Sequence, residues 1–303
     1  MPPGPPEPPG GGGAGAGPGL TIVDAHVHFW DPAELHYPWL DGLPALGRSF
    51  LPAHYRAAVG GAPVERVLFV EANCLPDESR REVALVERLA AANDAGPPRV
   101  AGIVAFADLT APPAALGRAL DALARRPRVK GVRQNIQGHA PGFALERGFV
   151  DGVAEVGRRG LTFDLCATHD QMGEVLELVE RCPATRLVLD HCGKPAIRDR
   201  RVEPWAADVA RIADHEHVCC KLSGLLTEAG SASWRDEDLV PYAEHVLACF
   251  GPERVMFGSD WPVLTLAGTF GGWYGFTERL TASWSPAERQ RFYGDNAVRV
   301  YGL

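Results

Sequence analysis

Residues 186–195 of this chain have the sequence Arg-Leu-Val-Leu-Asp-His-Cys-Gly-Lys-Pro. The apolar run at the start lacks polar alternation, which is typical of a parallel strand covered on both faces. The Gly-Lys-Pro that follows predicts a turn, so His191 stands where the strand finishes. Polar residues at the carboxyl ends of buried parallel strands are the expected site residues of an α/β barrel.

Seven similar apolar runs accompany this stretch, and most intervals between them have helical periodicity. In residues 171–181, for example, Met172, Val175, Leu176 and Val179 fall on one face of a helix. Eight strand–helix units predict an α/β protein with a single (β/α)8 TIM barrel; a doubly wound sheet is the alternative, but it needs no eighth strand. The expected strands span residues 21–26, 65–71, 99–106, 129–134, 161–166, 186–191, 217–223 and 254–259.

The bulk composition agrees with one large enzyme-sized domain. A length of 303 residues suits a barrel over residues 20–303, and 46% hydrophobic residues can fill its core. The net charge of −8 argues against nucleic acid and anionic membranes as partners, and no apolar run is long enough for a membrane span. The seven cysteines form no C-x-x-C pair, which favours reduced thiols in a cytoplasmic protein.

The first 19 residues differ from the rest. Residues 1–19 are almost all Pro, Gly and Ala, and they lack the basic and apolar regions of a signal peptide. Because such a segment cannot bury apolar surface, we expect a disordered tail.

Two further strand ends carry ionisable residues. Asp24-Ala-His-Val-His28 closes the first run and Gly258-Ser-Asp-Trp-Pro262 closes the last. Residues two apart in a strand point to one side, so His26 and His28 are expected to face the barrel axis together. Imidazoles and a carboxylate gathered there can bind a divalent metal or position a water molecule directly. We therefore expect a hydrolytic site in which Asp260 takes a proton from water as general base.

Structural alternatives exist for each of these residues. His26 and His28 can be hydrogen-bonded core histidines, and His191 can bond to a backbone carbonyl. Asp260 can cap the following helix. The combination of all four at strand ends favours the functional interpretation.

Other polar and aromatic residues are expected to contact a substrate. Arg133 should end the fourth strand, and its guanidinium can bind a carboxylate or a sugar hydroxyl. The long segment 29–60 is rich in aromatic residues and follows the first strand, where substrate contacts are common. The residues expected to bind substrate are Arg133, Glu71, Asn73, Trp39, Trp261 and Lys221.

Several assignments stay open at this point. Lys221 is a positioning cation if it points inward, and otherwise pairs with a helix acid. His169 and Lys194 lie in loops, and the sequence does not decide whether they belong to the site. Asp24 either orients His26 from behind or only begins the strand, and Trp30 is a sugar-stacking candidate that core packing explains equally well.

Four stretches together resemble the amidohydrolase superfamily, in particular the branch containing L-fuconolactonase, L-rhamnonolactonase and 2-pyrone-4,6-dicarboxylate lactonase. They are residues 26–28, 190–195, 221–224 and 256–262. The resemblance implies a distorted barrel that hydrolyses the ester of a lactone ring. By position it assigns catalytic roles to His26, His28, His191 and Asp260.

The resemblance also bears on metal, because some members of the branch use zinc and others work without metal. Lys130 leads into the fourth strand instead of ending it, so no bridging group for two metals is expected. We expect either no metal or one weakly held divalent metal, with zinc as the first choice. Its ligands would be His26, His28, His191 and Asp260.

The favoured substrate is a small-molecule lactone, most simply a sugar aldonolactone opened to its aldonic acid. A dicarboxylate lactonase is the first alternative; it should need a second basic residue beside Arg133, where Gly138 and His139 stand instead. A zinc-dependent decarboxylase of the same superfamily is the second. A barrel that binds a ligand without turnover is the third.

Overall fold

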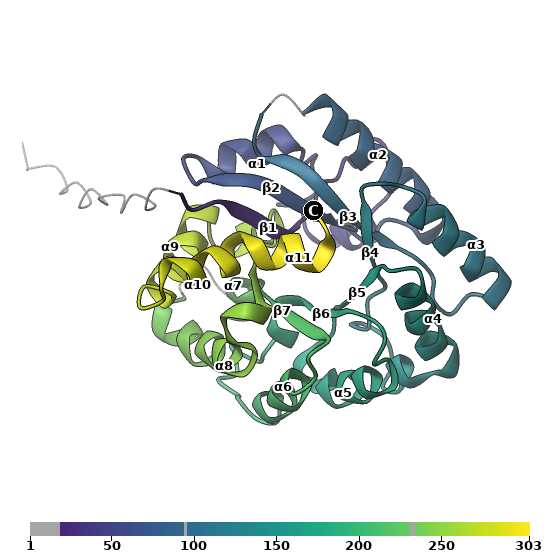
Figure 1. The fold of residues 1–303 in the computed structure, drawn as a ribbon. Coiled ribbons are helices and arrows are strands. Elements are labelled where there is room, and N and C mark those ends of the chain that lie inside the picture. The colour runs from purple at the N-terminus through teal and green to yellow at the C-terminus, as the bar shows by residue number, and fades with distance from the viewer. Residues whose placement is uncertain (1–18, 94–95, 231–233) are drawn as a thin grey trace, which may run out of the picture.

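Eight parallel strands pair in chain order and form a nearly closed barrel surrounded by helices (Figure 1). This computed structural model describes residues 19–93, 96–230 and 234–303. The tail predicted over residues 1–19 lies outside the described residues, except for Gly19. The strands are β1 (Ile22–Val27), β2 (Val64–Val70), β3 (Arg99–Phe106), β4 (Val129–Arg133), β5 (Thr162–Leu165), β6 (Leu187–Leu189), β7 (Val218–Leu222) and β8 (Val255–Phe257).

Helices cover the outer face of the barrel and one of its ends. Pro113 occupies the first turn of its helix, and the Ser285 hydroxyl accepts a hydrogen bond from the amide of Glu288 at the start of another. The helices are α1 (Pro52–Val59), α2 (Ser79–Ala92), α3 (Pro113–Ala124), α4 (Arg147–Arg158), α5 (Met172–Arg181), α6 (Trp205–Ala213), α7 (Leu225–Glu228), α8 (Asp236–Arg254), α9 (Phe270–Leu280), α10 (Pro286–Gln290) and α11 (Asn296–Tyr301).

The predicted barrel is confirmed, and each predicted strand overlaps an observed one with ends within two residues. Closure comes from the residues just after β8. The amide of Asp260 donates to the carbonyl of His26 at 2.9 Å, and the amide of His28 donates to that of Trp261 at 2.8 Å. These bonds hold the chain after β8 beside the end of β1, so two of the predicted motifs meet at the same edge.

The interior of the barrel is filled by small and branched side chains. Val23, Leu68, Val104 and Val188 belong to one buried cluster, and Tyr301 from α11 joins it. Figure 1 looks along the barrel with α11 lying across this end, opposite to the carboxyl ends of the strands. The C-terminal helix therefore closes the bottom of the barrel and leaves the catalytic edge at the top.

No helix in the described ranges is long and apolar enough to cross a lipid bilayer.

Candidate active site

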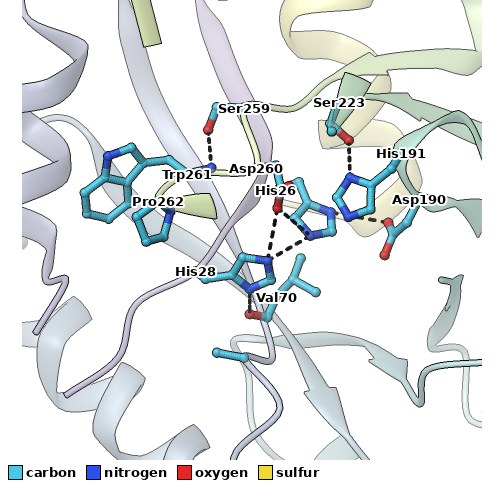
Figure 2. A network of polar contacts seen from close by, with 12 residues as sticks. His26, His28, Val70, Asp190, His191, Ser223, Ser259, Asp260, Trp261 and Pro262 are labelled. Carbon is cyan, nitrogen blue, oxygen red and sulfur yellow. Dashed lines mark hydrogen bonds and ion pairs between the residues drawn. The ribbon is translucent and has the colours of Figure 1, made fainter. Parts of the chain in front are cut away.

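The ends of β1, β6 and β8 bring the four predicted catalytic residues together (Figure 2). The Nε2 atoms of His26 and His28 lie 3.2 Å apart. The Oδ1 atom of Asp260 is 3.3 Å from Nε2 of His28 and 3.9 Å from Nε2 of His26. The ring of His191 completes the group, with its centre 4.3 Å from that of His26. All four side chains are buried, at 0 to 5% exposure, so they interact in a setting that solvent screens weakly.

Left-handed backbone aims two of these side chains. Asp260 has φ 60°, and His191, Cys192 and Lys194 have φ 53°, 55° and 46°. Such a conformation costs a non-glycine residue about 1–2 kcal/mol. Strained backbone of this kind concentrates at functional sites, where the surrounding structure enforces it.

Two glycines allow the strands to approach the histidines closely. A Cβ atom on Gly224, which has φ 70°, would stand 2.7 Å from Nδ1 of His191. A Cβ atom on Gly258 would stand 3.0 Å from Cβ of His26. Both contacts are too tight for any larger residue without movement of the site, which explains glycine at these two positions.

Hydrogen bonds fix how the imidazoles present their nitrogens. His28 donates from Nδ1 to the carbonyl of Val70 at 2.8 Å, because a carbonyl can only accept. Its Nε2 is thereby turned toward Asp260, 3.3 Å from Oδ1. His191 uses Nδ1 to contact the hydroxyl of Ser223 at 2.9 Å, which orients this ring against β7.

Burial and mutual charge set the protonation states. Burial lowers the pKa of His191 to about 4 despite the opposing effect of Asp260 and Asp190, and burial also holds the pKa of His26 well below its usual value. Burial alone would raise the pKa of Asp260, but His191, His28 and His26 outweigh it and hold that pKa well below its ordinary value. At neutral pH the site therefore combines neutral His26 and His191 with an ionised carboxylate.

The donor set fits one divalent cation. Ligand atoms of His26, His28 and Asp260 lie within 4.8 Å of one another, as do those of His26, Asp190 and His191. Imidazole nitrogens and a carboxylate oxygen are the donors that zinc prefers. Lone pairs that converge at 3.2–3.9 Å repel one another unless a proton or a cation lies between them.

A cavity of about 250 Å³ opens above these residues. His28, His191 and Asp260 line it, together with the indole of Trp39, whose Nε1 donates to the carbonyl of Ala72 at 2.8 Å. Its other lining side chains are mostly polar and include Asn73, Asn135, Gln137 and Lys194. The walls therefore offer an aromatic face and many hydrogen-bonding groups.

Arg133 lines the same cavity, but the protein occupies most of its guanidinium. Its Nε donates to Glu71 at 2.7 Å, Nη2 to the carbonyl of Glu71 at 2.6 Å, and Nη1 to Asp190 at 3.2 Å. Glu71 in turn accepts the amide of Asn73 at 2.7 Å. The predicted substrate ligands Arg133 and Glu71 thus bind each other, whereas Asn73 stands exposed at the cavity.

Three predicted substrate ligands are not among the described residues that line the cavity: Glu71, Trp261 and Lys221. Trp261 is 2% exposed and packs against Tyr55 and Phe50, with ring centres 5.3 and 5.5 Å away. The left-handed turn at Asp260 sends the next side chain away from the cavity. Lys221 does point inward, but it is fully buried and binds Asp164 at 2.6 Å and Asp190 at 3.0 Å.

The sequence did not decide whether four further residues belong to the site. The structure places one of them at the cavity and the other three away from it. Lys194 lines the cavity, and its Nζ donates to Oε1 of Gln137 at 2.5 Å. His169 instead contacts Arg201 on the surface, and Trp30 is buried with its Nε1 donating to backbone carbonyls of the β1–β2 segment. Asp24 is buried and accepts bonds from the amide of Ser259 and from the hydroxyl of Tyr55, both at 2.8 Å.

Sequence reasoning missed the carboxylates beneath the site. Asp190 lies 3.3 Å from Nδ1 of His26, although in the sequence it looks like the last residue of an apolar strand. Asp164 in β5 had no signal beyond being an acid inside an apolar run, which is a rare position for an unpaired charge. That rarity is the signal from which both residues could have been found.

Comparisons with known proteins show what the chain as a whole is similar to. The amidohydrolase family model matches residues 23–303. An L-fucono-1,5-lactonase of Burkholderia multivorans is 33% identical over 303 residues, covering 94% of this chain and 97% of the relative. Another, from Burkholderia ambifaria, is 32% identical over 290 residues, with 93% and 95% covered. An amidohydrolase structure from Burkholderia multivorans with bound zinc superposes with a TM-score of 0.82, at 33% identity, covering 93% of this chain and 99% of that one.

Proposed function

This chain belongs to the amidohydrolase family, and from that premise we propose that it is a lactonase that opens a sugar aldonolactone to the aldonic acid. The observation that carries the proposal is the position of ionised Asp260 beside three histidines at the floor of a polar cavity. This arrangement supplies a proton acceptor for water and polarising groups for an ester carbonyl within one small volume.

In the reaction, the oxygen of water attacks the carbonyl carbon of the lactone. Asp260 takes the proton that the water loses, while His26 and His28 contact this carboxylate, and an N–H of His191, which lines the cavity, stabilises the oxygen that becomes negative. The bond from the carbonyl carbon to the ring oxygen then breaks. Asp260 returns the proton to that oxygen, which leaves as a hydroxyl group, and the new carboxylic acid ionises.

A divalent cation would be held by His26, His28, His191 and Asp260, with zinc as the first choice by donor type and by the zinc in the related Burkholderia structure. When bound, such an ion supplies Lewis-acid polarisation of an oxygen. The protein itself supplies the orientation, since His28 is fixed by the carbonyl of Val70 and His191 by Ser223.

The cavity favours a neutral polyhydroxy substrate. Asn73, Asn135 and Gln137 can exchange hydrogen bonds with hydroxyl groups, and the ring of Trp39 offers an apolar face. A dicarboxylate would need free cations, but Arg133 is paired with Glu71 and Asp190, which leaves Lys194 at the cavity. Two relatives, at 33% and 32% identity, are named L-fucono-1,5-lactonase, so a deoxy-sugar 1,5-lactone is the first substrate to test.

The test is acid release from a panel of 1,4- and 1,5-aldonolactones, with a pyrone dicarboxylate lactone and an aromatic carboxylic acid as comparisons. We expect acid release from at least one aldonolactone and slower turnover of the dicarboxylate. Activity confined to the dicarboxylate would favour the alternative lactonase, and carbon dioxide release from the aromatic acid would favour a decarboxylase. Ligand binding without turnover across the panel would mean that the barrel only binds.

A further inference from the structure

Beneath the catalytic residues lie four buried polar side chains that the proposed reaction does not use, and they form a line that ends on His26. It runs from the hydroxyl of Tyr301 to Asp164 (2.9 Å), from Asp164 to Lys221 (2.6 Å), from Lys221 to Asp190 (3.0 Å), and from Asp190 to Nδ1 of His26 (3.3 Å). We call these five residues the buried chain. Each is at most 3% exposed, so water does not compete for their contacts.

The buried chain connects the two ends of the barrel. Tyr301 belongs to α11, which closes the bottom, and its ring also packs against Lys221, whose Nζ lies 5.3 Å from the ring centre. His26 stands at the top, beside His28 and Asp260. The C-terminal helix is thereby in polar contact with the catalytic edge through the core of the barrel.

We propose that the buried chain fixes the tautomer and orientation of His26, so that Tyr301, Asp164, Lys221 and Asp190 are positioning residues for catalysis. The proposal rests on the lactonase function only where turnover is the readout. Nδ1 of His26 lies 3.3 Å from Oδ1 of Asp190, which can only accept a proton, and 3.4 Å from Nζ of Lys221, which can only donate one. Nη1 of Arg133, also a donor only, lies 3.4 Å from Nε2, so the proton of His26 is placed on Nδ1, toward Asp190. Nε2 of His26 is then left with a lone pair facing His28 and Asp260.

Lys221 is the shared member on which this arrangement depends. Its ammonium is pulled by Asp164 on one side and by Asp190 on the other, and the contact with Asp164 is the shorter one. The hydroxyl of Tyr301 lies 2.9 Å from both oxygens of Asp164 and donates its one proton to this carboxylate, which weakens the attraction of Asp164 for Lys221. Without that hydroxyl, Lys221 should move toward Asp164 and away from Asp190. The contact between Asp190 and His26 should then be less well fixed.

The variant Tyr301→Phe tests this with little change in volume. Tyr293→Phe is the matched control, because the Tyr293 hydroxyl is also buried but bonds to Thr277 at 3.0 Å, away from the buried chain. Loss of a residue that orients a ligand histidine lowers activity or metal affinity by about 10- to 100-fold. We expect Tyr301→Phe to lower kcat for an aldonolactone by about 10-fold, at the low end of that range, with KM nearly unchanged. Tyr293→Phe should leave both constants unchanged.

A readout that does not need turnover is the nitrogen-15 NMR spectrum of labelled histidine, with His26 assigned by comparison with His26→Asn. We expect wild-type His26 in metal-free protein to carry its proton on Nδ1, and Tyr301→Phe and Asp164→Asn to give a mixture of tautomers. A titration with zinc should show weaker binding in both variants. Wild-type His26 protonated on Nε2, or a Tyr301→Phe spectrum and zinc affinity matching those of Tyr293→Phe, would overturn the proposal. Absence of lactonase activity in wild type would count against the proposed function alone.

Discussion

Buried carboxylates have different partners at the top of the barrel and in the layer beneath it. At the top, Asp260 faces the nitrogens of His26 and His28 and has no Lys or Arg of the described chain within ion-pair distance. One layer down, Lys221 and Arg133 contact three carboxylates, those of Asp164, Asp190 and Glu71. The lower layer is paired and holds the barrel together, whereas the upper layer is left with unused lone pairs that a substrate, water or cation can take.

The first prediction is that the upper layer determines activity. Asp260→Asn keeps the shape of the side chain but removes the proton acceptor, so kcat should fall by about 10²–10⁴, the usual share of general acid–base catalysis. KM should change much less, because the cavity walls are untouched. Steady-state kinetics on the best aldonolactone measure both constants. A variant that keeps most of the wild-type kcat would assign Asp260 a structural role at the end of β8.

The second prediction is that the ion pairs of the lower layer contribute to the stability of the fold. Lys221→Met leaves Asp164 and Asp190 buried without their shared cation, and breaking such a pair costs about 3–5 kcal/mol. Lys194→Met is the control, since Lys194 is a half-buried lysine at the mouth of the cavity. Urea unfolding should show a large loss for the first variant and little change for the second. Equal losses would mean that the lower layer does not stabilise the barrel through Lys221.

The strand ends could be predicted from sequence because their signals are local. His26, His28, His191 and Asp260 each follow an apolar run, and the ends of parallel strands meet at one edge whatever the side chains do. The buried chain could not be predicted in the same way. Tyr301 and Asp164 are 137 positions apart, and no spacing rule indicates that their side chains meet inside the barrel.

The placement of Trp261 shows a second limit. Its neighbour Asp260 faces the cavity, and Trp261 is among the residues that the sequence predicts to bind substrate. The φ of 60° at Asp260 reverses this, and Trp261 packs among Phe29, Phe50 and Tyr55 instead. Backbone in the left-handed region is enforced by tertiary contacts, and an aspartate alone does not reveal it.

The third prediction concerns metal in the upper layer. The surrounding histidines already hold the pKa of Asp260 low against the effect of burial, so the general base stays ionised without a cation. We expect at most one divalent ion per chain, readily lost, and substantial activity after prolonged chelation. Elemental analysis beside activity before and after chelation measures this. Activity that disappears on removal of one tightly bound zinc and returns with zinc would make the ion essential.

The fourth prediction uses a carboxyl that belongs to neither arrangement. Burial, reinforced by Glu71, raises the pKa of Glu82 to about 8, and its Oε2 has no hydrogen-bond partner in the described part of the chain. The folded protein keeps this proton up to about pH 8, whereas the unfolded chain releases it near pH 4.5. The contribution of Glu82 to stability should therefore fall as the pH rises from 4.5 to 8.

Glu82→Gln removes that dependence, because glutamine is neutral throughout and can still accept the amide of Ala72, which Glu82 accepts at 3.0 Å. The difference between the melting temperatures at pH 5 and at pH 8.5 should be smaller in the variant than in wild type. The same difference between the two pH values in both proteins would show that Glu82 is ionised in the fold.

The source of the new oxygen in the product tests hydrolysis at this site most directly. In the proposed reaction, water activated by Asp260 attacks the carbonyl carbon of the lactone. In water enriched in oxygen-18, initial-rate product from an aldonolactone should carry one labelled oxygen in its carboxylate, with the slow background measured using Asp260→Asn. Product formed by the wild-type protein without the label would mean that the acyl group moves between hydroxyls of the sugar without water, and would contradict hydrolysis at this site.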